Sequence, residues 1–158
     1  MKAASLAEIK KELKYLDETI LIEYCLRLGR FKKDNKELLT YLLFEASNES
    51  NFILSIKNEI DEDISNINTN HTYYIKKSLR KTLRNITKYI RYSGSKQTEV
   101  EILIHFCSAM KELSIKPERG TVLGNIYFRQ IDKIKKAMKS LHDDLQADYE
   151  YELEQIID

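Results

Sequence analysis

Apolar residues recur at helical spacing from one end of this 158-residue chain to the other. They stand three or four positions apart, and no stretch shows the sustained strict alternation of a β-strand. The pattern therefore predicts an all-α fold. With 42% hydrophobic and 32% charged residues, the chain suits one compact domain over residues 1–158, because a chain of this length buries roughly 70% of its unfolded surface.

Polar capping residues divide the pattern into six or seven helices. Helix starts are predicted at Ser5 (in a capping box with Glu8), Asp17, Asp34, Asn48 or Ser50, His71, Ser95 or Thr98, and Val122. Gly94 suits the left-handed backbone just past a helix end, and Ser114 to Gly120 is predicted to be a loop. The last helix either continues from Val122 into the acidic tail or breaks near His142 to Asp144.

Short links between successive helices favour antiparallel neighbours, which predicts hairpins of the second with the third helix, the fourth with the fifth, and the sixth with the seventh. We expect an orthogonal bundle or a short α-solenoid-like array, since hairpins of this size are typical solenoid units. The sixth helix, which reaches Leu113, should lie at the centre because apolar residues cover more than half of its circumference. Its predicted core residues are Leu103, Ile104, Phe106 and Cys107.

The sequence also indicates a compartment. Apolar residues never run unbroken for more than about five positions, whereas a membrane helix needs roughly 20. The first residues lack the apolar core of a secretory signal, so we expect a cytoplasmic protein without a membrane span. Cys25 and Cys107 stand at apolar helical positions, which predicts two free, buried thiols.

Charge is partitioned along the chain, although Lys and Arg total 26 against 25 Asp and Glu. Between Ile64 and Thr98 there are basic residues but no Asp or Glu. On a helical wheel Lys81, Arg84, Lys88 and Arg91 lie within about 40° of Lys77. We call this set, together with Arg80, the basic ridge; it comprises Lys77, Arg80, Lys81, Arg84, Lys88 and Arg91.

Four interpretations of the basic ridge remain open. It is a solvated face, or it pairs with the acidic C-terminal segment 143–158 in the same chain or a symmetric partner. Alternatively it binds a protein partner, or it binds nucleic acid. Nearby tyrosines are compatible with the last possibility, because aromatic rings can stack on the bases of single strands. These are Tyr73, Tyr74, Tyr89 and Tyr92.

The segment 92–99 is a polar hinge in front of the central helix. Its hydroxyls, its lysine and the N–H groups of a helix start suit a phosphate or carboxylate, with Ser93, Ser95 and Lys96 as candidate ligands. The glycine pattern of a Walker loop is missing. Ser93 and Lys96 have the nucleophile spacing of penicillin-recognising enzymes, but the further motifs of those enzymes are absent. Plain helix capping is the alternative interpretation.

No catalytic, metal or cofactor site is predicted. His105 lies near Glu101 and Glu112 on one helix face, but the paired Glu-x-x-His motifs of di-iron bundles do not occur. We expect His105 to pair with a neighbouring Glu. The sequence also lacks Cys-x-x-Cys and His-Glu-x-x-His.

Three segments resemble an uncharacterised bacterial all-helical family. They are Tyr41-Leu42-Leu43-Phe44-Glu45-Ala46, Tyr92-Ser93-Gly94-Ser95-Lys96-Gln97-Thr98-Glu99-Val100 and Ser140-Leu141-His142-Asp143-Asp144-Leu145-Gln146. The resemblance covers about Asp34 to Leu153. It implies a bacterial, cytoplasmic, helical protein and carries over no functional residue.

These observations favour a non-enzymatic helical scaffold or protein-interaction module, in which the ligand is a protein partner or a second copy of the chain. The first alternative is nucleic-acid binding through the basic ridge of the helix at about 71–93. The second alternative is an enzyme that handles a small anion or a nucleotide at the 92–99 hinge.

Overall fold

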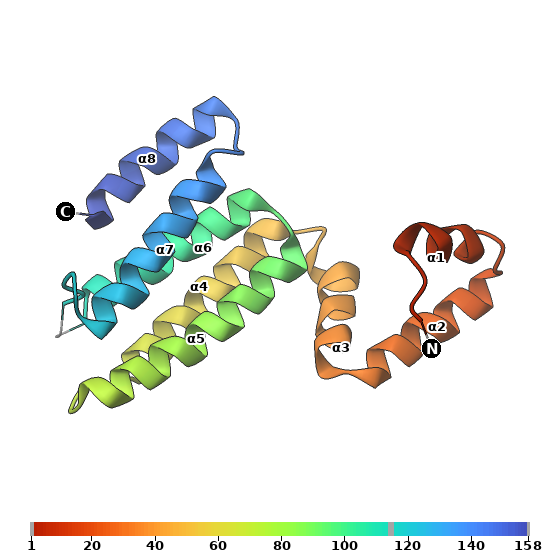
Figure 1. Cartoon of the computed structure of the whole chain (residues 1–158), viewed down its shortest axis with the longest axis horizontal. Helices are drawn as coiled ribbons and strands as arrows, with labels where there is room; N and C mark the ends of the chain where they lie inside the picture. Colours follow the sequence, from red (N-terminus) through yellow and green to blue (C-terminus); the bar gives the residue numbers. More distant parts are fainter. Residues whose placement is uncertain (1, 114–115, 158) are drawn as a thin grey trace. The chain divides into compact units, whose positions relative to one another are not determined.

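The structure is a computed structural model that describes residues 2–113 and 116–157 (Figure 1). Over these residues the chain is helical and has no β-strand, which confirms the all-α prediction. By its internal contacts the chain divides into two compact units, Met1–Phe44 and Glu45–Asp158, and each is described by itself. Among the described helices, none is both long and apolar enough to cross a membrane.

The first unit contains three short α-helices followed by a π-helical turn. They are α1 (Leu6–Leu13), α2 (Glu18–Phe31), α3 (Lys33–Thr40) and the π-helix Tyr41–Glu45, which runs past the end of the unit. Ser5 and Glu8 form the predicted capping box, and the Asp17 carboxylate accepts a hydrogen bond from the Ile20 amide at 3.0 Å. These local hydrogen bonds fix the starts of α1 and α2.

The predicted helix start at Asp34 is wrong, both in its position and in the side-chain cap that it implied. Helix α3 begins at Lys33, and Lys32 precedes it without a side-chain cap. Instead, the side-chain amide of Asn35 donates to the Leu28 carbonyl at 2.9 Å, and this bond satisfies one of the carbonyls left without a partner at the end of α2.

The prediction of two buried thiols is half correct. Cys107 is buried, whereas Cys25 is exposed. Apolar residues stand on more than one side of α2, and α3 packs against it where a Cβ on Gly29 would lie 3.1 Å from Leu39. Because one neighbouring helix covers only one side, apolar neighbours in sequence do not guarantee burial.

The second unit contains five α-helices. They are α4 (Glu49–Ser65), α5 (Thr72–Ser93), α6 (Lys96–Lys111), α7 (Val122–Met138) and α8 (Asp143–Ile157). The described residues therefore form eight α-helices rather than six or seven. Two residues of the predicted loop Ser114 to Gly120, 114 and 115, lie outside the described residues.

Helix α6 occupies the centre of this unit, as predicted. It packs against α4, α5, α7 and α8. Leu103, Ile104, Phe106 and Cys107 are all buried, which confirms the predicted core. A helix with neighbours on every side needs apolar residues around most of its circumference, and this explains its sequence.

The eighth helix arises from a break between α7 and α8. The Ser140 hydroxyl donates to the Ala137 carbonyl at 2.8 Å, and the Leu141 amide donates to the Met138 carbonyl at 2.9 Å. These bonds close the last turn of α7. The His142 carbonyl then accepts from the Gln146 amide at 3.0 Å, which begins α8.

Helix α8 lies beside α7 (Figure 1) and packs against α6 and α7. Tyr149, Leu153 and Ile156 are buried, and the Tyr149 hydroxyl donates to Glu101 at 2.8 Å. The Tyr127 hydroxyl donates to the Ile156 carbonyl. The tail thus docks on the body of its own unit mainly through apolar contacts.

Candidate functional site

The basic ridge lies on the solvent side of α5. Ile75, Leu79 and Ile86 on the opposite side are almost completely buried. The described ridge residues are exposed, except that Lys88 is half-buried with its ammonium 5.8 Å from the centre of the Tyr89 ring. Helical periodicity thus separates the charges from the core as the sequence predicted.

The side of α5 that meets α4 carries neutral hydrogen-bond donors. The Thr82 hydroxyl donates to Asp63 at 2.7 Å. Further along α5, the side chains of Asn85 and Tyr89 donate to the Glu59 carboxylate at 3.4 and 3.1 Å. Carboxylates of α4 are therefore bound to neutral groups of α5 in these hydrogen bonds.

Five of the six ridge bases make no ion pair within the described parts of the chain. No ion pair there involves Lys77, Arg80, Lys81, Arg84 or Arg91. The acids of α8 are exposed, and α8 packs against α6 and α7. Asp158, the last acid of segment 143–158, lies outside the described residues. The described acids of the tail do not neutralise these five bases.

The hinge between α5 and α6 forms through local backbone chemistry. Gly94 takes a φ of 67°, the left-handed conformation that ends a helix and favours glycine, as predicted. The Ser95 hydroxyl then accepts from the Thr98 amide at 3.3 Å and caps α6. This choice of Ser95 resolves the start that the sequence left open between Ser95 and Thr98.

Ser93, one of the three predicted anion ligands, binds inside the protein. Its hydroxyl donates to the Glu49 carboxylate at 2.5 Å, and the Thr98 hydroxyl donates to the same oxygen at 2.5 Å. Glu49 thereby joins the first turn of α4 to the end of α5 and the start of α6. We call this the Glu49 cluster; it holds the hinge in place, and Ser93 does not line the groove described next.

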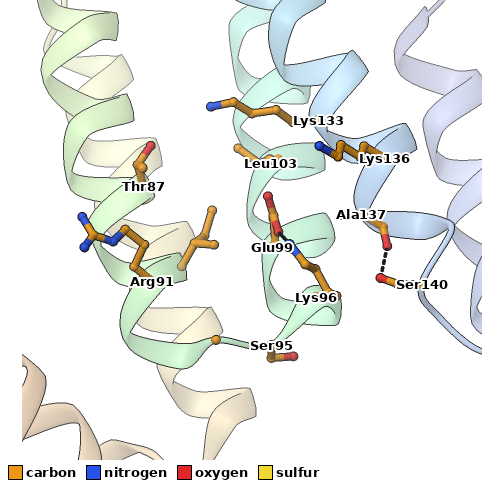
Figure 2. A pocket seen from close by; sticks show the side chains of 12 residues that line it. Thr87, Arg91, Ser95, Lys96, Glu99, Leu103, Lys133, Lys136, Ala137 and Ser140 are labelled. Atoms are coloured by element: carbon orange, nitrogen blue, oxygen red, sulfur yellow. Dashed lines mark hydrogen bonds and ion pairs between the residues drawn. The ribbon is translucent and has the colours of Figure 1, made fainter. Parts of the chain in front are cut away.

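Beside the hinge lies a groove of about 650 Å³ (Figure 2). Helix α5 forms one side, α7 forms the other, and α6 lies between them. The residues that line it are Thr87, Ile90, Arg91, Gly94, Ser95, Lys96, Glu99, Leu103, Lys133, Lys136, Ala137 and Ser140. It joins the last base of the ridge to two of the predicted anion ligands, Ser95 and Lys96.

Four cationic side chains and one carboxylate line this groove, which we call the cationic groove. Arg91 comes from α5, Lys96 from α6, and Lys133 and Lys136 from α7. Figure 2 shows the two α7 lysines extending toward the side on which α5 lies. The single carboxylate, Glu99, already pairs with Lys96 at 2.6 Å. The groove therefore presents unmatched positive charge that suits an anion.

The sequence pattern did not predict that the two α7 lysines, Lys133 and Lys136, belong to a site. They stand three positions apart and are exposed, while Ile134 and Ala137 beside them are buried. That spacing places both lysines on one polar side of the helix and was readable in the sequence. The direction in which that side faces depends on how α7 packs on α6.

A second pocket of about 460 Å³ lies beside the Glu49 cluster. It is lined by both Glu49 and Glu101, and Lys57 pairs with Glu101 at 3.5 Å. His105 lies outside this pocket and contacts Asp61 of α4 at 2.7 Å, so the expected pairing with a neighbouring Glu is wrong. No group of three or more His, Cys, Asp or Glu among the described residues has a metal-binding arrangement.

Comparison of the chain with protein-family models, with curated proteins and with solved structures finds no match. The resemblance to a bacterial helical family stays a prediction.

Proposed function

We propose that the unit Glu45–Asp158 is a non-enzymatic binding module that holds an anionic group of its ligand in the cationic groove. The observation that carries this proposal is the convergence of four cationic side chains from three helices on one groove with a single, paired carboxylate. Phosphates and carboxylates are the groups that such an arrangement attracts.

Two of the three hydroxyls that line the groove, those of Ser95 and Ser140, already make hydrogen bonds that support binding rather than catalysis. Ser95 caps α6, and the Ser140 hydroxyl donates to the Ala137 carbonyl. Glu99 is paired with Lys96. A nucleophile needs a base within hydrogen-bond reach, and neither of these two hydroxyls contacts Glu99 or a groove lysine among the described hydrogen bonds.

The test measures binding of inorganic polyphosphate, which carries charge but neither sugars nor bases, to the full-length chain. In a double variant, Lys133→Glu with Lys136→Glu, we expect the affinity to fall about tenfold or more, equivalent to about 1.4 kcal/mol. The matched control is Lys135→Glu with Lys139→Glu, which makes the same charge change at exposed positions of the same region outside the groove.

The control pair should lose clearly less affinity than the groove pair. Equal losses in the two double variants would show that overall charge, and not the groove, determines binding, and the proposal would then be wrong. Circular dichroism of both variants establishes that the helices remain folded.

A further inference from the structure

Two exposed tyrosines stand at the far end of α5 from the cationic groove. Tyr73 is 60% exposed and Tyr74 is 45% exposed. Their ring centres lie 5.5 Å apart at an interplanar angle of 76°, and the Lys76 ammonium lies 5.6 Å from the centre of the Tyr73 ring. Large aromatic rings in water beside a cation offer stacking faces to a ligand.

Tyr73 lies in line with the basic ridge. It precedes Lys77 by four positions, which on an α-helix places both residues on the same side. Arg91, at the other end of the ridge, lines the cationic groove. The exposed tyrosine, the ridge and the groove therefore follow one another along a single helix of 22 residues.

The dimensions of this path fit a short polymer. Tyr73 and Arg91 are separated by about 27 Å along the axis of α5 at 1.5 Å per residue. Phosphates of a stacked nucleic-acid strand repeat about every 3.4 Å, so roughly eight of them span this distance. A single small anion would occupy the groove alone and would not reach the tyrosines.

We propose that α5 is the binding surface for single-stranded nucleic acid, with phosphates along the ridge and in the cationic groove and with bases stacked on Tyr73 and Tyr74. This inference rests on the proposed function and adds the class of ligand. A single strand is favoured over a duplex because paired bases cover their faces in the stack, while aromatic side chains need open base faces. It is favoured over an acidic peptide because carboxylates give tyrosine rings no stacking partner.

The experiment compares labelled probes on the full-length chain by fluorescence anisotropy. The probes are an oligothymidylate of about 15 nucleotides, an abasic strand of the same length, the corresponding DNA duplex and a polyglutamate peptide. We expect the oligothymidylate to bind at least fivefold more tightly than each of the other three.

The decisive variant combines Tyr73→Leu with Tyr74→Leu. It should lower oligothymidylate affinity about tenfold and leave affinity for the abasic strand within twofold, because stacking and not charge is removed. The matched control is Tyr151→Leu, which changes a tyrosine that is 68% exposed on α8 and should have no effect. Both tyrosine sites are exposed, so the variants should fold.

The outcomes separate this inference from the proposed function. If the abasic strand, the duplex or polyglutamate binds as tightly as oligothymidylate, or if the tyrosine variant keeps full affinity, the inference fails while the groove remains an anion site. If the groove variant Lys133→Glu with Lys136→Glu binds polyphosphate normally, the proposed function fails. Both proposals are supported if the tyrosine variant and the groove variant each lose affinity for oligothymidylate and only the groove variant loses affinity for the abasic strand.

Discussion

Truncation of Phe106 tests whether α6 is the centre of the second unit. The Phe106 side chain is 0% exposed, and α6 packs against α4, α5, α7 and α8. A buried aromatic side chain removes roughly 150–250 Å² from water, which at about 25 cal/mol per Å² is about 4–6 kcal/mol. Alanine keeps part of this area, so we expect Phe106→Ala to lower the free energy of unfolding by about 3–5 kcal/mol.

The assay is urea denaturation followed by far-ultraviolet circular dichroism, with the slope against denaturant compared between proteins. Typical domains are stable by about 5–15 kcal/mol, so the variant should remain folded in water with a much lower midpoint. Tyr151→Ala is the control, because this aromatic side chain is 68% exposed. It should change the unfolding free energy by less than about 0.5 kcal/mol.

A loss below about 1 kcal/mol at an unchanged slope for Phe106→Ala would refute the reasoning. It would mean that the side chain is not enclosed by the four neighbouring helices. A loss equal to that of Tyr151→Ala would likewise show that burial does not decide the effect.

Two further measurements use the two thiols and the buried phenol of Tyr127. At pH 8 in native conditions we expect a thiol reagent to label Cys25 and not Cys107, because Cys25 is exposed while burial raises the pKa of Cys107 to about 12; rapid labelling of both thiols would contradict this. Burial, with a smaller contribution from Cys107, also raises the pKa of Tyr127 to about 12. In the unfolded chain this phenol ionises near pH 10, so its contribution to the free energy of unfolding is full below about pH 10 and is lost as the pH rises to about 12. Tyr127→Phe should reduce this loss of stability at alkaline pH, measured by denaturation at several pH values. An unchanged dependence of stability on pH would contradict the prediction.

Several helix ends, unlike the start of α3, were predictable because the groups that decide them are neighbours in sequence. Ser5, Asp17, Asn48 and Ser95 each accept a hydrogen bond from an amide three positions later, and Gly94 takes the left-handed backbone that ends α5. Each of these interactions needs only one turn of chain. The segmentation into helices follows from such local chemistry.

The candidate site was predictable only in part because its remaining contacts join distant segments. The Ser93 hydroxyl is a group that can bind an anion, but it donates a hydrogen bond to Glu49, which lies 44 positions away in the sequence. Lys133 and Lys136 reach the groove only through the packing of α7 on α6. Sequence spacing shows which residues share a side of a helix and does not show what that side faces.

On α5, the neutral side chains that donate hydrogen bonds to α4 are different residues from the bases of the ridge. Glu59 and Asp63 of α4 accept hydrogen bonds from neutral side chains of α5 and not from the ridge bases. Like charges three or four positions apart on a helix destabilise it by about 0.2–0.5 kcal/mol per pair, so the ridge repels itself and gathers anions from solution. In the proposed complex, the ridge bases would release the cations condensed on the phosphates of the polymer, and this release would make the affinity depend strongly on salt. The neutral donors that bind α4 to α5 thus occupy α5 positions other than those of the ridge bases, which we propose bind a polyanion.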